Sequence, residues 1–392
     1  MKKFRLKKGI HEGDYRILIL TLGISLFGII MEFSAGYYVS LSKYGDPYNY
    51  LKSAAVWFLI GWAIFIFCSF VDYSIYSHLA VLALIAGFVL LGLVFTPLGV
   101  TINNATRWIQ IGNGPTIMPG EIIKTCMILF FSWFYAEKAE RAKKPLWILF
   151  ALIIAGTAFF LIYKQPNLST ALIVVMLVVG MMFLAGLPLI YVVGTIAAGI
   201  AGVVFLLTFK GGYMMERVTS FTHPFDDALG SGYQVVQGLL ALGSGGVFGL
   251  GLGNSIQKAF YLPEAQSDFI LPIIGEELGF VGVLCLLIAY LILVYVILST
   301  AIRAKDRFGM LLAGGVGLHL GLQVILNVAV VTATAPPTGV VLPLISAGGN
   351  ALILYMAELG IVYNISKQAR EMDMKEDLQS AEDSDLITVN ER

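Results

Sequence analysis

Charged residues are scarce in this chain of 392 residues. Only 13% of the residues are Asp, Glu, Lys or Arg, whereas 58% are hydrophobic, and the mean hydropathy is +0.84. This composition excludes a soluble protein. The alternating ten-residue pattern of a membrane β-barrel is also missing. Apolar stretches near 20 residues recur instead, and each is long enough to cross a bilayer core of about 30 Å as a helix. The sequence therefore predicts an all-α, polytopic integral membrane protein.

The residue types that usually hold metals or cofactors are also few. Cys68, Cys126 and Cys285 lie inside apolar runs without metal-ligand spacing, and the four histidines are scattered. We expect the cysteines to be small buried hydrophobic residues. The glycine-rich run 243–253 contains a G-x-G spacing, but no strand precedes it, so close packing of a re-entrant segment is favoured over nucleotide binding. No organic cofactor and no nucleic-acid partner is expected.

Ten helical segments can be counted, and their loops carry an uneven charge. The segments cover about 17–38, 54–70, 75–95, 119–135, 146–163, 168–187, 189–209, 268–301, 308–334 and 343–366. Basic residues gather at the N-terminus, in 137–145, in 303–307 and after the last helix. With ten helices all four groups fall on one side, and the positive-inside rule then makes both termini cytoplasmic.

Three regions follow from this count. Residues 1–16 form a basic cytoplasmic N-terminus, 17–366 a ten-helix domain, and 367–392 an acidic cytoplasmic tail. The composition of the tail is typical of a disordered segment. The outer loop 210–267 is long but rich in glycine, aromatic and aliphatic residues, so we expect it to be a compact cap that lies against the membrane.

Asp268 is the leading candidate for chemistry, because it lies where this loop turns into a hydrophobic helix. At the boundary of the low-dielectric membrane interior, the surroundings of an ionisable group can shift its pKa, which makes such a group a functional candidate. A structural interpretation also stands: Asp is a favoured N-cap, and Pro272 suits the first turn of a helix.

Other charged residues leave alternatives open. Glu121 and Lys124 are spaced i,i+3, which predicts an ion pair that is either structural or substrate-facing. Glu276 and Glu277 are expected to form internal hydrogen bonds to neighbouring helices. The basic residues Arg107, Arg217 and Lys258 lie in outer loops, where cations can bind lipid headgroups or pyrophosphate, or remain solvated surface charges.

Several motifs occur together in a fixed order along nearly the whole chain, from about Tyr15 to Arg370. They are Asn104-Ala105-Thr106-Arg107-Trp108-Ile109, Pro119-Gly120-Glu121-Ile122-Ile123-Lys124, Gln165-Pro166-Asn167-Leu168, Gly232-Tyr233-Gln234, Gly245-Gly246-Val247-Phe248-Gly249, the nine residues 261–269 (Y-L-P-E-A-Q-S-D-F) with Gly275-Glu276-Glu277-Leu278-Gly279, and Leu342-Pro343-Leu344-Ile345-Ser346. In these motifs the chain resembles the SEDS family (shape, elongation, division and sporulation), and it looks closer to the FtsW/SpoVE branch than to RodA.

The resemblance implies a specific activity. Members of the family polymerise lipid II into glycan strands on the outer face of the cytoplasmic membrane, together with a class B penicillin-binding protein. Asp268 matches the essential loop carboxylate of the family. It is assigned as the base that deprotonates the acceptor hydroxyl and, second, as a ligand of a divalent cation such as Mg²⁺ or Mn²⁺. Undecaprenyl pyrophosphate leaves with inversion at the anomeric carbon.

The remaining assignments concern substrate binding. Lys124 and Arg107 are candidates for pyrophosphate contacts, together with the outer-loop cation Lys258. Glu121 would position Lys124, and Gln234 would bind substrate.

The chain also departs from the family pattern. Asn167 and Ser169 stand where Q-P-D-x-G is common, Gln237-Gly238 replaces Q-S, Gly120 replaces Ser, and residues 346–351 read S-A-G-G-N-A instead of S-Y-G-G-S-S. These changes suggest a divergent paralogue and keep open a scaffold that only docks its penicillin-binding partner. A lipid-linked precursor flippase is the other alternative. It predicts polar residues throughout the span interiors, whereas here Glu32, Gln323 and Asn327 are the main ones outside the outer ends, so a polymerase is favoured.

Overall fold

The computed structural model describes residues 13–390 except 103–104, 111, 113–114, 196, 198, 200–223, 231 and 338, and only the backbone for 371–390. Residues 1–12, most of the expected span 189–209, the first part of the long outer loop and Arg217 therefore lie outside the described residues. The protein is largely helical, which confirms the predicted fold class.

In the described part of the chain, nine helices correspond to nine of the ten expected spans. They are α1 (Tyr15–Tyr44), α2 (Asn49–Phe70), α3 (Ser74–Leu93), α4 (Pro119–Glu137), α5 (Pro145–Lys164), α6 (Leu168–Leu184), α10 (Ile270–Ile302), α11 (Arg307–Val331) and α12 (Gly349–Asn390). Six of them, α1, α2, α3, α5, α10 and α11, are long and apolar enough to cross a membrane. A further helix, α9 (Tyr233–Ser244), lies ahead of α10, and a short 3₁₀ helix, η1 (Ala139–Lys143), precedes α5.

The helix boundaries follow local chemistry. Asp14 and Asp306 are the N-caps of α1 and α11, and Asp306 accepts a 2.7 Å hydrogen bond from the Gly309 N–H. Pro119 and Pro145 occupy the first turns of α4 and α5, where a missing N–H costs nothing. Gly45 ends α1 with φ 68°, a conformation that glycine adopts without strain.

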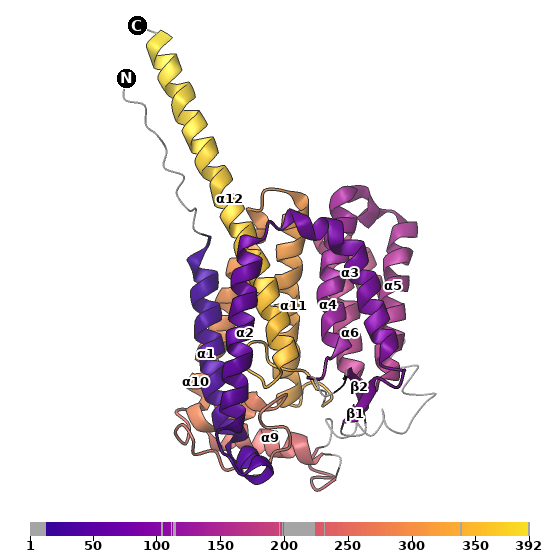
Figure 1. Cartoon of the computed structure of the whole chain (residues 1–392), viewed down its shortest axis with the longest axis vertical. Helices are drawn as coiled ribbons and strands as arrows, with labels where there is room; N and C mark the ends of the chain where they lie inside the picture. Colours follow the sequence, from indigo (N-terminus) through magenta and orange to yellow (C-terminus); the bar gives the residue numbers. More distant parts are fainter. Residues whose placement is uncertain are drawn as a thin grey trace.

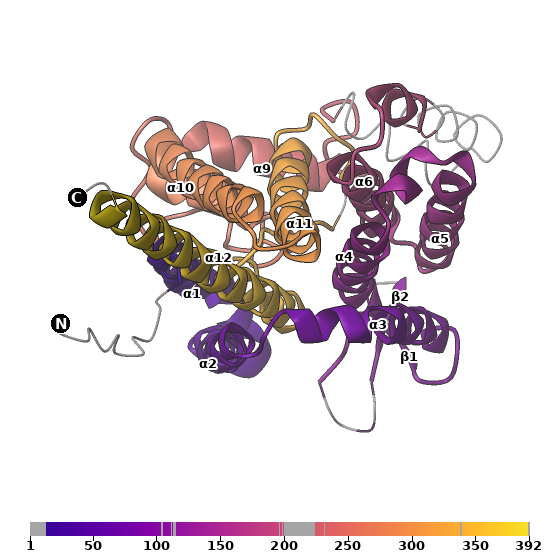
Figure 2. The same ribbon diagram turned by 90° about the horizontal axis from the view of Figure 1, so that it is seen from above.

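The helices pack as two groups that meet at α4 and α11. Viewed from above, α1, α2, α9, α10, α11 and α12 lie on one side and α3 to α6 on the other (Figure 2). Contacts of α11 with α4 and α6 join the two groups. The buried apolar residues form one continuous core through both.

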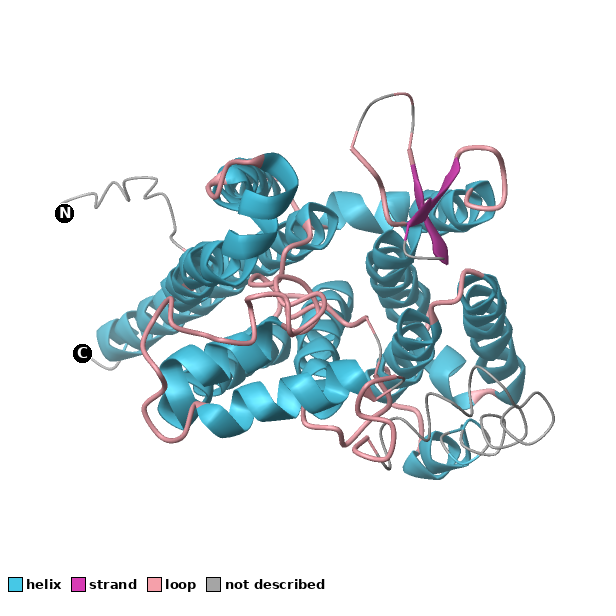
Figure 3. Ribbon diagram, turned by 90° about the horizontal axis from the view of Figure 1, so that it is seen from below, coloured by secondary structure: helices cyan, strands magenta, loops and turns pink. Residues whose placement is uncertain are grey.

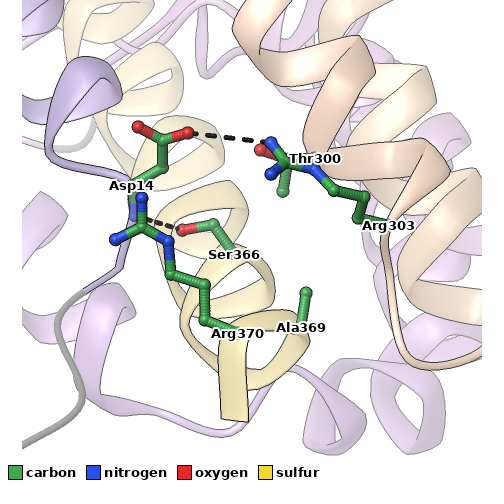
Figure 4. A pocket seen from close by; sticks show the side chains of 6 residues that line it. All are labelled: Asp14, Thr300, Arg303, Ser366, Ala369 and Arg370. Carbon is green, nitrogen blue, oxygen red and sulfur yellow. Dashed lines mark hydrogen bonds and ion pairs between the residues drawn. The ribbon is translucent and has the colours of Figure 1, made fainter. Parts of the chain in front are cut away.

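α1 begins and α12 projects at one end of the bundle, while α9 and the strands lie at the other (Figure 1). At the α12 end a small polar cluster ties three helices together (Figure 4). The Asp14 carboxylate lies 3.9 Å from Arg303 at the end of α10, and the Asp14 N–H donates to Ser366 Oγ of α12 at 2.9 Å. The hydrogen bond from the Arg16 side chain is the main cause of the lowered pKa of Asp14.

The backbone of the acidic tail is helical and continues α12 to Asn390. Disorder of the tail stays a prediction. Two physical reasons favour the helix. The segment is rich in Ala, Leu, Met, Glu, Lys and Gln, which have high helix propensity. It also extends a helix that is already packed, so it avoids the cost of nucleation.

A two-stranded antiparallel hairpin was not expected in an all-α chain. β1 (Gly99–Ile102) pairs with β2 (Ala105–Ile109) in the connection between α3 and α4. The β-branched and aromatic residues in these strands favour extended structure. The hairpin is an addition to the helical fold, and it carries Arg107 on β2.

The glycine-rich run 243–253 packs against α10 at the point where α10 is interrupted. This agrees with the close packing that was expected for the run. Gly279 interrupts α10 with φ 69° and ψ −170°. The N–H groups of Leu250 and Gly251 each donate at 2.9 Å to the main-chain oxygens of Glu276 and Glu277. A Cβ atom at Gly249 would lie 2.2 Å from the Glu277 oxygen, so a larger residue cannot approach α10 this closely.

Candidate functional site

Asp268 lies near the end of the connection between α9 and α10, and its side chain does not cap α10. α10 begins at Ile270, its N-cap is Phe269, and no side chain caps it. The N-cap interpretation of Asp268 is therefore wrong. Its carboxylate instead accepts a 3.1 Å hydrogen bond from Ser267 Oγ, and it keeps some exposed surface. The carboxylate is thus available for a role other than holding the helix end.

The backbone at Asp268 forms a hydrogen bond with a side chain of α11. The side-chain amide of Asn327, in α11, donates to the main-chain oxygen of Asp268 at 2.9 Å and to that of Val340 at 2.6 Å. Ser346 Oγ donates to the Ser267 oxygen at 2.6 Å. Asn327 is fully buried. The loop that contains Asp268 is therefore fastened to α11 and to the α11–α12 connection, as expected for a preorganised carboxylate.

Arg107, on β2, approaches Asp268 from the hairpin. Its guanidinium donates to the main-chain oxygens of Gln165, at 3.3 Å, and of Pro166. A Cβ atom at Gly339 would lie 3.5 Å from Asp268 Oδ2 and 3.9 Å from Arg107 Nη1. Four connections thus meet at this point, those that carry Asp268, Arg107, Pro166 and Gly339, at the end of the bundle that Figure 3 shows with the hairpin and loops in front. The structure brings Asp268 and Arg107 together, as their joint assignment to one site requires.

The pKa of the Asp268 carboxyl group is raised to near neutral pH. Removal from water and then the negative charge of Glu264 raise its pKa to about 7, against the opposing effects of the Ser267 hydrogen bond and of Arg107. A carboxyl group with a pKa near 7 can exist as a base and can hold a proton at the pH of a cell exterior. This pairing of geometry and charge makes Asp268 a candidate general base.

Gln234 supports the same segment from α9. Its side-chain amide donates to the main-chain oxygen of Pro263 at 3.3 Å, within the motif 261–269 that contains Asp268. The described contact is therefore with the loop, and a role of Gln234 in substrate binding stays a prediction.

Glu121 and Lys124 form the ion pair that their spacing predicted. Lys124 Nζ lies 2.7 Å from Glu121 Oε2 and 3.3 Å from Gln323 Oε1. Lys124 has no exposed surface, and Glu121 is 7% exposed. The pair is thus a buried link between α4 and α11, and contact of Lys124 with pyrophosphate stays a prediction.

Lys258 is also buried rather than solvated. Its Nζ atom lies 2.7 Å from Glu277 Oε1 and 2.9 Å from Ser34 Oγ of α1. Glu276 accepts hydrogen bonds from the N–H groups of Ile256, at 3.0 Å, and Gln257, at 3.3 Å. The expected hydrogen bond to a neighbouring helix is confirmed for Glu277, which accepts from Ser34 Oγ of α1, whereas the partners of Glu276 lie in the connection between α9 and α10. Binding of substrate by Lys258 stays a prediction.

Sequence reasoning missed a second polar cluster inside the bundle. His319 Nδ1 of α11 lies 3.0 Å from Glu358 Oε2 of α12, and Thr125 Oγ1 of α4 donates to Glu358 Oε1 at 2.6 Å. The signal was present, because His319, Gln323 and Asn327 recur every four residues and share one face of α11. Interior polar residues are therefore more numerous than we expected, but these are buried and paired.

Two of the departures from the family pattern have clear structural roles. Asn167 accepts a 3.3 Å hydrogen bond from the Thr170 N–H and is the N-cap of α6, a position where Asn and Asp are nearly equivalent. The Asn350 amide donates to the Thr116 oxygen at 2.7 Å. Both side chains therefore take part in local hydrogen bonds.

The residues around Asp268 offer few side-chain ligands to a metal ion. No group of three His, Cys, Asp or Glu side chains converges among the described residues. Asp268 has one carboxylate close enough to affect its pKa, that of Glu264. Mg²⁺ is commonly held by one or two carboxylates together with substrate phosphates and water, and the site fits that mode of binding.

Comparison with known proteins places the chain among cell cycle proteins. The sequence model described as "FTSW_RODA_SPOVE: Cell cycle protein" matches residues 15–371. A "Probable peptidoglycan glycosyltransferase FtsW" of Geobacter sp. (strain M18) is 35% identical over 91% of this chain and 97% of its own length. "Stage V sporulation protein E" of Bacillus subtilis (strain 168) is 36% identical over 91% of this chain and 98% of its own length.

Solved structures share the fold. The crystal structure of the Thermus thermophilus rod shape determining protein RodA is 25% identical, with a TM-score of 0.65 over 91% of this chain and 97% of that one. A chain of a peptidoglycan synthase complex that coordinates polymerization and crosslinking is 24% identical, with a TM-score of 0.76 over 91% of this chain and 98% of that one. The latter likeness concerns the fold alone.

Proposed function

Because the chain belongs to the FtsW/RodA/SpoVE family of cell cycle proteins, we propose that it is a peptidoglycan glycosyltransferase that polymerises lipid II with Asp268 as its general base. The proposal rests on the Asp268 carboxylate, which is partly exposed, has a pKa near 7 and lies beside Arg107. The backbone of the same residue is held by a hydrogen bond from Asn327. The protein is an enzyme of the membrane. It resembles relatives named for this activity over more than nine tenths of the chain.

The reaction needs one proton acceptor and one stabilised leaving group. The acceptor's 4-hydroxyl attacks the donor's anomeric carbon while Asp268 takes the hydroxyl proton. A new C–O bond forms as the bond to undecaprenyl pyrophosphate breaks on the opposite face, which inverts the configuration. Arg107 lies close enough to Asp268 to affect its pKa, and it would offset the negative charge of the departing pyrophosphate.

A divalent cation, Mg²⁺ or Mn²⁺, belongs to the proposal as a further source of positive charge. Asp268, with Glu264 close by, and the substrate phosphates would hold it. Bound there, it would neutralise charge on the pyrophosphate.

The arrangement of the bundle supports the expected orientation. Figure 1 shows α9 and the hairpin at the end opposite to the start of α1 and the projection of α12, and the connection from α9 to α10 carries Asp268. In the proposal the termini are cytoplasmic in the bacterial inner membrane, and Asp268 faces the outer leaflet, where flipped lipid II arrives. A class B penicillin-binding protein would cross-link the product.

Polymerisation of lipid II by the purified full-length protein tests the assignment. Wild type and Asp268→Asn are compared with and without a class B penicillin-binding protein and Mg²⁺, and glycan is resolved by gel electrophoresis. We expect polymer from wild type and at least a hundred-fold less from Asp268→Asn, because loss of a general base costs about 10²–10⁴-fold. Polymer that survives the substitution would overturn the role of Asp268. No polymer from wild type would favour the scaffold or the flippase.

A further inference from the structure

Glu32 is a carboxyl group within the membrane-spanning helix α1, and the proposed reaction does not use it. Its side chain is partly buried, and it forms no hydrogen bond or ion pair with any other described residue. Ionisable residues inside membrane spans are rare and energetically costly, and those that occur usually mark functional sites. No internal partner offsets the cost of Glu32, so its carboxyl group is available to a ligand.

The contacts of two glycines show which way this part of α1 faces. Gly28 and Gly36 lie four residues before and after Glu32, so the three residues share one face of the helix. A Cβ atom at Gly28 would lie 2.6 Å from the Leu344 oxygen, and one at Gly36 would lie 2.9 Å from the Tyr50 ring. Glu32 therefore faces the region between the α11–α12 connection and the first turn of α2.

This region adjoins the loop that carries Asp268. The Tyr50 phenol interacts with the side chain of Gln266, and it lies close enough to Glu32 for the charge of the carboxyl group to act on it. The Ala347 N–H donates a 2.9 Å hydrogen bond to the Gln266 oxygen. Because Gln266 is two residues from Asp268, Glu32 and Tyr50 form the part of the site that α1 and α2 contribute.

This part of the site differs in charge from the part that Arg107 contributes. Arg107 belongs to the hairpin that follows α3, in the other group of helices (Figure 2). The charged groups that act on Glu32 and Tyr50 include no cation in the described part of the chain, so pyrophosphate has no partner there. A carboxyl group accepts hydrogen bonds, and a phenol ring offers a flat apolar face. Together they suit an uncharged sugar with hydroxyl and N–H donors.

We propose that Glu32 and Tyr50 bind the acceptor sugar of lipid II, Glu32 through hydrogen bonds to its hydroxyl and acetamido groups and Tyr50 through contact with the ring. The sugar supplies the hydrogen bonds that Glu32 lacks, which offsets the cost of a buried polar group. This inference rests on the proposed function, because it names the subsite that presents the acceptor hydroxyl to Asp268. Glu32 thus becomes a residue that selects the saccharide part of the substrate, whereas Arg107 meets the pyrophosphate.

Thermal unfolding of the full-length protein in detergent measures binding without turnover, because a ligand of the folded state raises the unfolding temperature. Wild type, Glu32→Leu and Glu32→Gln are titrated with lipid II and, separately, with undecaprenyl pyrophosphate, which has no sugar. We expect Glu32→Leu to weaken lipid II binding about tenfold and to leave undecaprenyl pyrophosphate unaffected. Glu32→Gln keeps hydrogen-bonding groups and should stay within about threefold of wild type for both ligands.

The unfolding temperature without ligand separates a binding role from a structural one. Glu32→Leu removes an unpaired polar group from an apolar helix, so it should unfold at or above the wild-type temperature. Thr21→Val is the matched control, because Thr21 is buried with an unpaired hydroxyl on the same face of α1. It lies about 16 Å farther from Tyr50 along the helix at 1.5 Å per residue, and it should bind both ligands as wild type does. Tyr50→Phe, which keeps the ring, should bind lipid II more tightly than Tyr50→Leu.

Four results would overturn the proposal. They are unchanged lipid II binding in Glu32→Leu, equal weakening of both ligands, a lower unfolding temperature of ligand-free Glu32→Leu, and no stabilisation of wild type by lipid II. Equal weakening would place Glu32 at the pyrophosphate or the lipid tail, and a lower unfolding temperature would give it a structural role. Asp268→Asn should still bind both ligands although it makes no glycan, so failure of the base and failure of the subsite are distinguishable.

Discussion

The side-chain amide of Asn327 donates a 2.9 Å hydrogen bond to the main-chain oxygen of Asp268. The two residues are 59 positions apart in sequence, and the same amide also binds the Val340 oxygen at 2.6 Å. One buried side chain of α11 thus joins the loop of Asp268 to the α11–α12 connection. Asn327 is a positioning residue in this view, because it acts through the backbone of Asp268.

Replacement of Asn327 by Leu should lower kcat far more than it raises KM for lipid II. The loss of both hydrogen bonds frees the Asp268 loop, and a displacement of about 1 Å can cost about 10²-fold in rate. We expect a fall in kcat of about 10- to 100-fold, measured by steady-state polymerisation.

Ser346→Ala is the companion variant, because it removes the 2.6 Å bond to the neighbouring Ser267 oxygen. It should give a smaller loss in kcat. Asn254→Ala, which removes an amide bond to the Leu250 oxygen elsewhere in the loop, should leave kcat unchanged. A thermal midpoint that falls in parallel with kcat in all three variants would show a general loss of structure instead.

Polymerisation should rise with pH through about 7. Asp268 accepts a proton only when ionised, and its pKa is about 7 because burial and the charge of Glu264 favour the protonated form. Below this pH the carboxyl group is neutral and inactive as a base. The ascending limb of a plot of kcat/KM against pH reports this pKa in the free enzyme.

Glu264→Gln should move that limb to lower pH. The substitution removes a negative charge that raises the pKa of Asp268, so the carboxylate ionises more readily. We expect a shift of less than one pH unit, since burial is the larger cause. An unchanged limb in Glu264→Gln, or one that moves upward, would contradict the assignment of this limb to Asp268.

The Glu121–Lys124 pair allows stability and substrate binding to be separated. Lys124→Met leaves the buried Glu121 carboxylate without its cation, which typically costs about 3–5 kcal/mol. The double variant Glu121→Gln/Lys124→Met removes both charges and should recover most of the unfolding temperature, measured in detergent. If Lys124 also binds pyrophosphate, affinity for lipid II will stay low in the double variant. Recovered affinity would limit the pair to a structural role.

Much of this architecture could be predicted from the sequence, because a helix that crosses lipid must be apolar and long enough to span the bilayer. The apolar runs located nine of the helices, and the spacing of Glu121 and Lys124 predicted their contact. Asp268 emerged from its place at a loop–helix boundary. These are local signals, and a single sequence contains them.

Contacts between distant segments could not be predicted in the same way. The bond from Asn327 to Asp268, the approach of Arg107 and the pairing of His319 with Glu358 each join separate helices or loops. Their geometry depends on how the helices pack. Lys258 shows the same limit, because a basic residue in an outer loop predicts exposure, whereas Glu277 and Ser34 bury it.

Gly339 provides the most direct probe of the space between Asp268 and Arg107. A Cβ atom there would lie 3.5 Å from Asp268 Oδ2 and 3.9 Å from Arg107 Nη1, which is ordinary van der Waals contact. Gly339→Ala should therefore fold and keep activity within a few-fold. Gly339→Leu extends a side chain into the space where the acceptor hydroxyl must approach Asp268, and kcat/KM should fall by at least a hundred-fold.

Gly348 is the matched control for this series. It lies in the same connection, and a Cβ atom there has its nearest neighbours at 3.9 Å, on Ala351 and Ser346. Gly348→Leu adds the same bulk away from Asp268 and should retain activity, and both leucine variants should unfold at the wild-type temperature. Equal losses in the two variants would mean that bulk anywhere in the connection disturbs the enzyme. A fully active Gly339→Leu would place the reaction outside the space between Asp268 and Arg107.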